Sequence, residues 1–456
     1  MKKTTVLNVV GLTPRLIGEH TPFLRQWSSA GATATIIPPL PAVTCTAQAT
    51  YLTGCHPSEH GIVGNGWYFK DECEIKFWRQ SNKLVRAKKI WEYAKEKNPD
   101  FTCANLFWWY NMYSSVDYAV TPRPQYLADG RKFPDCYTTP PTLRDLLQSK
   151  LGTFPLFDFW GPKTSIRSSQ WIAEAAKIVE KLYAPTLTLI YLPHLDYNLQ
   201  RFGNAFPGIE KDLQEIDSVC RDLIQFYEQR HTQVIVLSEY GITPVQQPSA
   251  LNRIFRKHNL ITVREERGLE LLDAGASKAF AVADHQVAHI YINDSSALSQ
   301  IRSLLENTPG IELILDETGK KQYHLHHERA GDLVAVADAQ SWFSYYYWLD
   351  DRKAPDFART VDIHRKPGYD PVELFTDPGL NLLPLRIAFK LLSKKLGFRT
   401  LMDIIPLRAE LVGGSHGRVN NLPEDQPVFI SRDRNLVKNT LQAADVFNLL
   451  SAHLAI

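Results

Sequence analysis

Two hydrophobic patterns alternate along this chain. Runs rich in β-branched and apolar residues, typical of buried strands, occur at residues 6–10, 33–37, 186–192, 233–238, 288–292 and 332–337. Most of these runs are separated by stretches in which apolar residues recur at helical spacing. The alternation predicts an α/β fold, with a mainly parallel sheet flanked by helices.

The clearest helices are predicted at residues 168–184 and 207–230. The first opens on Ser168 or Ser169, whose hydroxyls suit an N-cap. The second has one apolar face, formed by Ile209, Leu213, Ile216, Val219, Leu223 and Phe226. Residues 66–165 are dense in aromatic residues and in turns that contain proline. We expect that region to lie beside the sheet as a wall or cover.

Composition describes an ordinary globular protein. The 456 residues are 44% hydrophobic, 22% charged and 11% aromatic. A chain of this length indicates one large domain with an insertion, or two lobes. The 51 basic and 49 acidic residues are dispersed along the chain and give a net charge of +2. This lack of a basic patch argues against a nucleic acid polymer as partner.

Several features predict a cytoplasmic protein without stable membrane insertion. The six cysteines lack CxxC spacing, which favours free thiols over a zinc ribbon or a disulfide scaffold. The first apolar run is shorter than that of a signal peptide, and no run approaches a transmembrane span. The basic, amphipathic segment Leu385–Phe398 would suit a membrane surface, but it is more typical of a surface helix with one buried stripe.

Candidate chemistry follows the predicted strands. Asp196 follows residues 186–192, Glu239 and Tyr240 end the run at 233–238, and Thr44 lies beyond 33–37. His416 sits in the late segment LVGGSHGRV. Ligands of doubly wound sheets gather at the carboxyl ends of strands, so we expect these side chains to approach one another.

The stretch PAVTCTAQATYLTGCHPSEHGIVGN, residues 41–65, mixes hydroxyl groups, histidines and glycines. Its separate parts also suit a helix cap and a glycine-rich turn. In order along the chain, the motifs VVGLTP, PAVT, TGCHPSEHGIVGN, DYNLQ, SEYG and GSHG resemble those of the alkaline phosphatase superfamily. The resemblance is to its nucleotide pyrophosphatase/phosphodiesterase branch, to which phosphonoacetate hydrolase is related.

The resemblance implies an alkaline phosphatase-like core at residues 1–245 and 401–456, with a smaller α+β cap lobe inserted at 246–400. It also implies a threonine nucleophile assisted by two metal ions, which agrees with the weak nucleophilicity of an unassisted hydroxyl. Thr44 matches the nucleophile and Asn65 a phosphate-contacting asparagine. The Cys45 backbone N–H would donate to a phosphoryl oxygen from a helix N-terminus.

The metal ligands match only in part. Asp196 and His416 match, whereas Val10, Gln200 and the Glu239–Tyr240 pair stand where the family has Asp, His and Asp-His. Two carboxylates and one imidazole suit one divalent ion (Zn, Mn or Mg) better than two. Gln200 shifts the preference towards harder ions such as magnesium, manganese or calcium.

Other residues are candidates for compensation or substrate contact. Asn8 would share a strand face with Val10, and Tyr240 could bond a phosphoryl oxygen. The segment AVADHQVAHIYI offers Asp284, His285 and His289 as a replacement metal site, although a core histidine at the entry of a strand is the more common situation. A third set, His364 and Arg365 in TVDIHRKPGYDP, would bind a phosphate or simply flank an exposed turn.

These features predict a hydrolase that cleaves a phosphodiester or related phosphorus ester, with a small phosphorylated substrate. The altered ligands keep two alternatives open. One is a catalytically degenerate phosphate-ester-binding or scaffold protein, and the other is a repurposed phosphoryl transferase or phosphonate hydrolase. The substrate and the oligomeric state are not indicated by the sequence.

Overall fold

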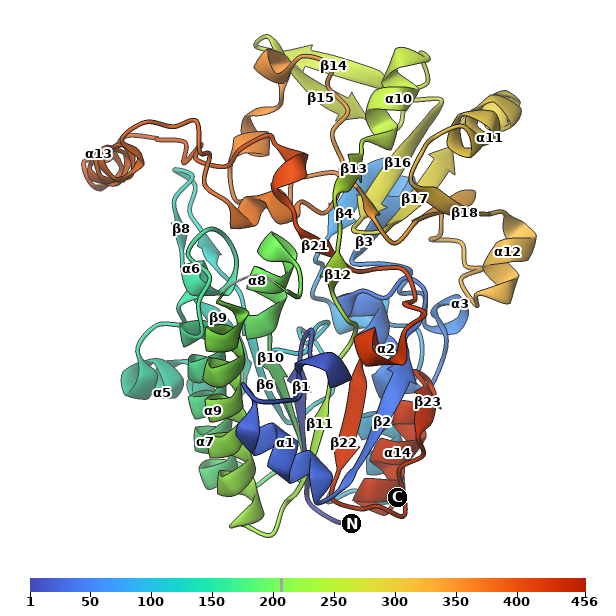
Figure 1. Cartoon of the computed structure of the whole chain (residues 1–456). Coiled ribbons are helices and arrows are strands. Elements are labelled where there is room, and N and C mark those ends of the chain that lie inside the picture. The colour runs from blue at the N-terminus through green and yellow to red at the C-terminus, as the bar shows by residue number, and fades with distance from the viewer. Residues whose placement is uncertain (206–207) are drawn as a thin grey trace.

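A nine-stranded sheet forms the centre of the computed structural model, which describes residues 1–205 and 208–456 (Figure 1). The strand order is β23-β2-β22-β11-β1-β10-β5-β6-β9. Their bounds are β1 Thr4–Val9, β2 Ala32–Ile37, β5 Cys103–Leu106, β6 Tyr118–Pro122, β9 Cys136–Thr139, β10 Leu187–Leu192, β11 Gln233–Leu237, β22 Val428–Ser431 and β23 Thr440–Gln442.

The sheet is mostly parallel. β1 is parallel to both neighbours, β10 and β11, and the pairs β10–β5, β5–β6 and β2–β23 are also parallel. β22 runs antiparallel between β11 and β2, and β9 runs antiparallel along β6. Because β1 and β10 are buried along their whole length, their apolar runs were readable in the sequence.

Helices cover both faces of this sheet (Figure 1). On one side α1 (Pro22–Ser29), α5 (Thr142–Leu151), α7 (Arg167–Tyr183) and α9 (Ile209–Glu228) pack together. On the other, α2 (Thr44–Thr53) packs on α14 (Asp445–Leu454). The two predicted helices are confirmed as α7 and α9, although Pro207 lies outside the described residues. α7 has Ile166 as its N-cap, and Ser168 instead donates to the Ser165 carbonyl.

The expectation for residues 66–165 is wrong in part. Strands β5, β6 and β9 come from this region and extend the central sheet to its edge. They are four or five residues long, too short for a clear periodic signal. The rest contributes α4 (Ile90–Lys97), α6 (Leu156–Phe159) and the two-stranded pairs β3–β4 (Gly66–Phe69 and Glu74–Phe77) and β7–β8 (Gln125–Tyr126 and Lys132–Phe133).

A second, antiparallel sheet lies above the carboxyl ends of β1, β10 and β11 (Figure 1). It contains β16 (Ala279–Asp284), β17 (Val287–Ile292), β19 (Leu333–Ala337) and β18 (Ile311–Leu315), in that order. Around it lie α10 (Leu251–Lys257), β14 (Thr262–Glu266), β15 (Leu269–Asp273), α11 (Leu298–Glu306) and α12 (Glu317–Gln322). We call residues 246–400 the cap; the predicted runs at 288–292 and 332–337 therefore belong to the cap sheet.

Short elements connect the central sheet and the cap. They are α3 (Pro57–His60), α8 (His194–Phe202), β12–β21 (Thr243–Pro244 and Gly414–Ser415) and β13–β20 (Gln247–Ser249 and Ser341–Phe343). Buried residues of the central region, including Leu40, Cys45, Ile62 and Val63, belong to the same hydrophobic cluster as the cap strands. The strands of the central sheet belong to a separate hydrophobic cluster, so the cap packs on the segments that follow these strands rather than on the strands themselves.

The segment Leu385–Phe398 forms most of α13 (Leu383–Lys395) and its C-terminal end. The prediction of a buried stripe is wrong, because within α13, all of which the structure describes, no side chain is buried. Among the described residues, none of the helices combines the length and the apolar character needed to span a bilayer. All six cysteines, which lie in the described ranges, are free thiols.

Candidate active site

A chain of hydrogen bonds links three of the predicted residues. Thr44 begins α2, and its Oγ1 lies 3.1 Å from the Tyr240 hydroxyl. That hydroxyl donates to Asp196 Oδ1 at 3.0 Å. Thr44 is 3% exposed and Asp196 7% exposed. The carboxyl ends of β2, β10 and β11 therefore do bring these side chains together, as expected from the strand-end rule.

Asp196 is held by α8, directly after β10. Gln200 follows one helical turn later, and its Nε2 donates to Asp196 Oδ2 at 2.7 Å. Both oxygens of this carboxylate thus accept a hydrogen bond. Burial raises the pKa of Asp196 to about 7, although the Tyr240 and Gln200 hydrogen bonds oppose the rise.

Glu239 is completely buried at the end of β11. Its Oε1 accepts hydrogen bonds from the side-chain amides of Asn8, on β1, and of Gln48, on α2. Burial raises the pKa of Glu239 to about 8, against the opposing effect of these bonds. Gln48 was not identified from the sequence. The sequence spacing could have indicated Gln48, because it lies four residues after Thr44 and therefore shares a face of α2 with it.

His416 lies in a stack of aromatic rings. Its ring is 3.6 Å from that of Tyr240 at an interplanar angle of 3°, and 3.7 Å from that of His285. Tyr369 extends the stack, 4.0 Å beyond His285. His416 Nδ1 is 2.8 Å from the Ala42 carbonyl, so this nitrogen carries the hydrogen. Burial lowers the pKa of His416 to about 3, which keeps the ring neutral.

The predicted phosphate contacts bind one another in this structure. The Cys45 backbone N–H donates to Asn65 Oδ1 at 3.0 Å. Asn65 in turn donates to Asp284 twice, from its backbone N at 2.7 Å and from Nδ2 at 3.1 Å. Gly64 makes this approach possible, since a Cβ there would lie 3.1 Å from Asp284 Oδ2. A phosphate would have to displace one of these partners to use the Cys45 N–H.

The cap reaches the site through the tight turn between β16 and β17. Asp284 ends β16, and His285 follows in a left-handed conformation with φ of 60°. Burial raises the pKa of Asp284 to about 7 and lowers that of His285. His289, on β17, is turned away from the site. Its Nε2 lies 2.9 Å from the Val63 carbonyl, and its Nδ1 accepts the Gly331 N–H at 3.1 Å.

The segment TVDIHRKPGYDP contributes Tyr369 to the stack rather than a charge. Arg365 is exposed and pairs with Asp362 at 3.2 Å. His364 lies beside the Phe77 backbone, and burial lowers its pKa to about 4. Lys366 is buried between Asp370 and Glu373, with its Nζ 3.2 Å and 2.8 Å from their carboxylates. The structure therefore brings neither Arg365 nor His364 into the hydrogen-bonded chain at Thr44.

Four buried acceptor atoms of the site have no hydrogen-bond partner among the described residues. They are Asn8 Oδ1, Gln200 Oε1, Glu239 Oε2 and His416 Nε2. A buried acceptor without a donor is unfavourable, and a bound cation would satisfy such atoms. Oxygen atoms and one imidazole nitrogen are suitable ligands for a divalent ion. These atoms are of the kinds that a divalent ion binds, but among the described residues Asp196, Glu239 and His416 do not form a group whose ligand atoms all lie close enough to share one ion.

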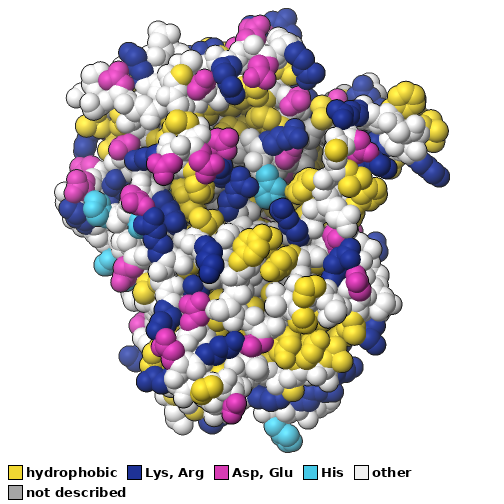
Figure 2. Space-filling view, turned by 180° about the vertical axis from the view of Figure 1, so that it is seen from behind, with side chains coloured by type: hydrophobic (Ala, Val, Ile, Leu, Met, Phe, Trp, Pro, Cys, Tyr) yellow, Lys and Arg dark blue, Asp and Glu magenta, His cyan; other side chains and the backbone are white. Residues whose placement is uncertain are grey.

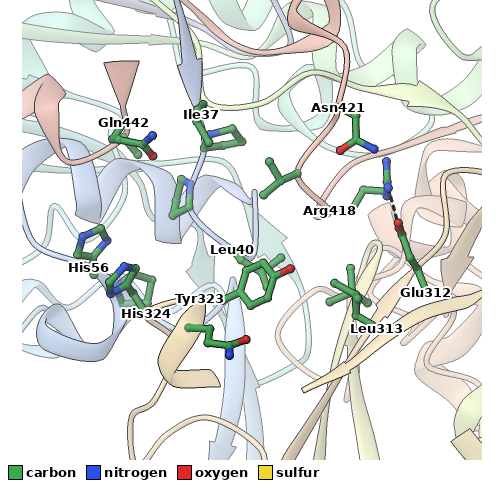
Figure 3. Close-up of a pocket in the computed structure, with 17 residues that line it drawn as sticks. Ile37, Leu40, His56, Glu312, Leu313, Tyr323, His324, Arg418, Asn421 and Gln442 are labelled. Atoms are coloured by element: carbon green, nitrogen blue, oxygen red, sulfur yellow. Dashed lines mark hydrogen bonds and ion pairs between the residues drawn. The ribbon is translucent and has the colours of Figure 1, made fainter. Parts of the chain in front are cut away.

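The site is closed between the central sheet and the cap. Gln200 and Glu239 are 0% exposed, and His416 is 2% exposed. A pocket of about 450 Å³ lies elsewhere at the junction, between the β2–α2 segment and the cap (Figure 3). Leu40, Leu313, Tyr323 and the paired Arg418 and Glu312 line it, together with the stacked rings of His56 and His324. The described lining residues of that pocket include none of the candidate site.

A further cluster holds α8 in place. His194 Nε2, at the start of α8, lies 3.2 Å from Glu215 and 3.5 Å from Asp212, both on α9. Among the described residues this is also a group whose ligand atoms approach one another closely enough to hold a metal. The contacts between this imidazole and the two carboxylates position the helix that presents Asp196.

A mixed sheet with a threonine at a helix N-terminus, and carboxylates and a histidine at the strand ends, is typical of alkaline phosphatase-like hydrolases. The chain matches the family model of "type I phosphodiesterase / nucleotide pyrophosphatase" over residues 4–370. It therefore belongs to this family, the nucleotide pyrophosphatase/phosphodiesterase branch of the alkaline phosphatase superfamily.

Curated relatives are similar over part of their length. An uncharacterized pyrophosphatase/phosphodiesterase of Schizosaccharomyces pombe is 26% identical over 268 residues, which cover 56% of this chain and 44% of that protein. Ectonucleotide pyrophosphatase/phosphodiesterase 2 of Saccharomyces cerevisiae is 25% identical over 264 residues, covering 53% and 48%. The matched segments thus span about half the length of these relatives.

Solved structures confirm the fold along the whole chain. Murine ectonucleotide pyrophosphatase/phosphodiesterase 5, an inactive variant in complex with AMP, has a TM-score of 0.61 at 16% identity and covers 100% of this chain and 96% of its own. Phosphonoacetate hydrolase from Sinorhizobium meliloti, in complex with phosphonoformate, has a TM-score of 0.62 at 14% identity and covers 99% and 96%. The predicted α/β fold and family resemblance are confirmed.

Proposed function

We propose that this protein hydrolyses a phosphodiester, pyrophosphate or related phosphorus ester of a small substrate, with Thr44 as the nucleophile. The observation that carries the proposal is the chain from Thr44 Oγ1 through the Tyr240 hydroxyl to Asp196. It gives the threonine proton a route to a carboxylate as the oxygen attacks phosphorus. An adjacent base of this kind is what a hydroxyl nucleophile requires.

In this mechanism the Thr44 oxygen forms a bond to phosphorus while the bond to the leaving oxygen breaks. The Thr44 proton moves to Tyr240, and the Tyr240 proton moves to Asp196. Asn65 and the Cys45 N–H would turn from each other to the phosphoryl oxygens. Water then hydrolyses the phosphothreonine, and the same chain returns a proton to Thr44. The buried, closed site keeps other water from the reacting atoms.

One divalent ion completes the proposed site. Gln200 and His416, or Glu239 and Asn8, would hold it through the acceptor atoms that lack donors. Asp196 would join the first set by exchanging a hydrogen bond from Tyr240 or Gln200 for the ion. When bound, it would neutralise charge on the phosphoryl oxygens and favour ionisation of the nearby hydroxyl. We expect Zn, Mn or Mg, and one ion per chain. The free thiols are consistent with the cytoplasm as the proposed compartment.

A second candidate function is phosphate-ester binding without turnover. Two observations favour it. The Tyr240 hydroxyl lies between Thr44 and Asp196, and the Cys45 and Asn65 groups already satisfy each other. A protein with this arrangement could retain a phosphorylated ligand without attacking it. Only the first function predicts turnover, and it predicts that this turnover depends on Thr44.

The experiment compares hydrolysis of bis(p-nitrophenyl) phosphate by the wild type and two variants, after metal analysis of the purified protein. Thr44→Ala removes the nucleophile, and we expect a loss of at least about 10³-fold. Thr53→Ala is the matched control, because its hydroxyl lies at the other end of the same helix, where it donates to the Ala49 carbonyl and accepts the Cys55 backbone N–H. Equal rates for Thr44→Ala and the wild type would overturn the proposal. Metal-free protein that binds phosphate esters without turnover would establish the second function.

A further inference from the structure

α13 stands away from the rest of the molecule. Figure 1 shows it at the end of two loop segments, beyond the edge of the cap. The space-filling view shows the same protrusion at the upper right, covered by hydrophobic and basic side chains (Figure 2). On its inner side, Leu383 and Ile387 pack against the hydrophobic cluster that contains the cap strands.

The outer side of α13 carries a continuous apolar stripe. Leu385, Phe389, Leu392 and Leu396 are 64%, 71%, 54% and 66% exposed. Their spacings of four, three and four residues place them on one face of the helix, within an arc of about 60°. Leu383 and Ile387 lie on the opposite face. The stripe is therefore not the side by which the helix packs on the cap.

Further large apolar side chains extend this surface beyond the helix ends. Leu382 is 70% exposed, Phe398 67% and Leu401 48%. Contiguous apolar surface of this kind is uncommon on a protein that meets only water, and it marks a contact site. We call the seven side chains from Leu382 to Leu401 the α13 stripe.

The charge around the stripe has one sign. Residues 383–399 contain Arg386, Lys390, Lys394, Lys395 and Arg399 and no acidic residue. Lys390 pairs with Asp403, whereas Arg386, Lys394 and Lys395 take part in no ion pair that the described residues form. Arg386 and Lys395 flank the stripe on its two sides. Two copies of this helix would repel each other through these charges. The charges therefore favour an anionic surface as the partner of the stripe.

We propose that α13 is an interfacial helix that docks the protein on an anionic lipid bilayer. A helix with an apolar face, flanking basic residues and no acidic ones lies in the plane of such a surface with its apolar side chains among the acyl chains. Its position beyond the cap lets it reach a flat surface that the body does not touch. The helix would lie on the bilayer rather than cross it, because its 13 residues are too few to span the hydrocarbon core. This proposal does not depend on the proposed hydrolase activity.

The test is co-sedimentation of the full chain with vesicles. We expect the wild type to partition at least about tenfold more strongly onto phosphatidylcholine vesicles that contain about 30% phosphatidylserine than onto pure phosphatidylcholine. Phe389→Ser with Leu392→Ser should weaken this partition at least tenfold by removing apolar contact. Arg386→Glu with Lys395→Glu should weaken it at least about tenfold by reversing the charge on both sides of the stripe.

Matched variants separate the helix from general surface effects. Phe157→Ser with Leu349→Ser changes two exposed apolar residues elsewhere, and Lys83→Glu with Lys257→Glu changes two exposed lysines. Both should bind vesicles like the wild type. Equal partition onto the two kinds of vesicle, or partition unaffected by the α13 variants, would overturn the proposal. So would a wild-type dimer in solution that the Phe389→Ser, Leu392→Ser variant converts to a monomer without any vesicle binding.

Discussion

The residue at position 240 is a main difference between this site and the family pattern. A tyrosine stands where the resemblance implies a metal-binding histidine, and its hydroxyl joins Thr44 to Asp196. Burial raises the pKa of Tyr240, so the hydroxyl keeps its proton and can donate it. The ring also packs flat on His416. One residue thereby fixes the nucleophile, the carboxylate and the histidine relative to one another.

We predict that Tyr240→Phe keeps the stack and removes the hydrogen-bonded route. Turnover should fall by about 10²-fold or more, the usual contribution of a positioned proton acceptor. The free energy of unfolding should fall by about 1–2 kcal/mol, because Asp196 loses a donor. The measurements are steady-state kinetics and urea unfolding. Tyr227→Phe is the control, because the buried Tyr227 hydroxyl donates to the Ala176 carbonyl, away from the site. This variant should lose stability but keep its turnover. Unchanged or faster turnover of Tyr240→Phe contradicts the relay.

At the scale of elements, the sequence predicted the three central strands of the large sheet, which are almost completely buried. The runs that became β1, β10 and β11 are continuous and apolar, and the residues that follow them were correctly placed at one edge of the sheet. The cap hairpin could not be placed. Its segment is a strand by composition, but only the tertiary packing brings Asp284 to Asn65 and leaves His289 inside the cap sheet. Periodicity carries no information on such contacts.

We predict that His289 makes stability depend on pH. Both of its ring nitrogens are used in the neutral form, and burial lowers its pKa from 6.5 to about 4. As the pH falls below 6.5, the unfolded chain therefore takes up the proton first. The free energy of unfolding should drop between pH 6.5 and pH 4, by about 3 kcal/mol from this residue.

Urea unfolding at several pH values tests this prediction. His289→Gln should be less stable than the wild type near pH 7, and its stability should fall less steeply below pH 6.5. Other buried histidines, such as His60, add to the slope in both proteins and cancel in the comparison. The same change at the exposed His231 should leave the slope as it is in the wild type. Parallel pH curves for His289→Gln and the wild type contradict the assignment.

At the scale of the whole molecule, the candidate site exists only where the cap meets the central sheet. Thr44, Asp196 and Glu239 come from the sheet side, whereas Asp284, His285 and Tyr369 come from the cap. All of them are buried, so the proposed reaction requires the two parts to separate before a substrate can enter. The sequence motifs lie almost entirely on the sheet side. This is why the family was recognisable, whereas the cap residues Asp284 and His285 could be named only as candidates and the place of Tyr369 in the stack was not predicted.

Arg329 is a residue of the cap that binds the segment between α3 and α4. Its guanidinium donates to the carbonyls of Gly61 and Leu84, both at 2.8 Å, and lies over the Trp67 ring. Gly61 lies four residues before Asn65, in the segment that carries one of the predicted phosphate contacts. Hydrogen bonds from a charged donor are stronger than neutral ones. Their removal should loosen the cap without touching the reacting groups.

We predict that Arg329→Met lowers the free energy of unfolding by about 2 kcal/mol, because two partly buried carbonyls lose a charged donor. Opening at the junction should become more frequent, so the Gln286 amide, which donates to the His416 carbonyl, should exchange its hydrogen faster. Hydrogen exchange read by mass spectrometry on peptides that contain residues 284–291 measures this. Arg302→Met, which removes only exposed ion pairs, should leave that exchange unchanged. If both variants exchange like the wild type, Arg329 does not hold the cap closed, and access to Thr44 is controlled by other contacts.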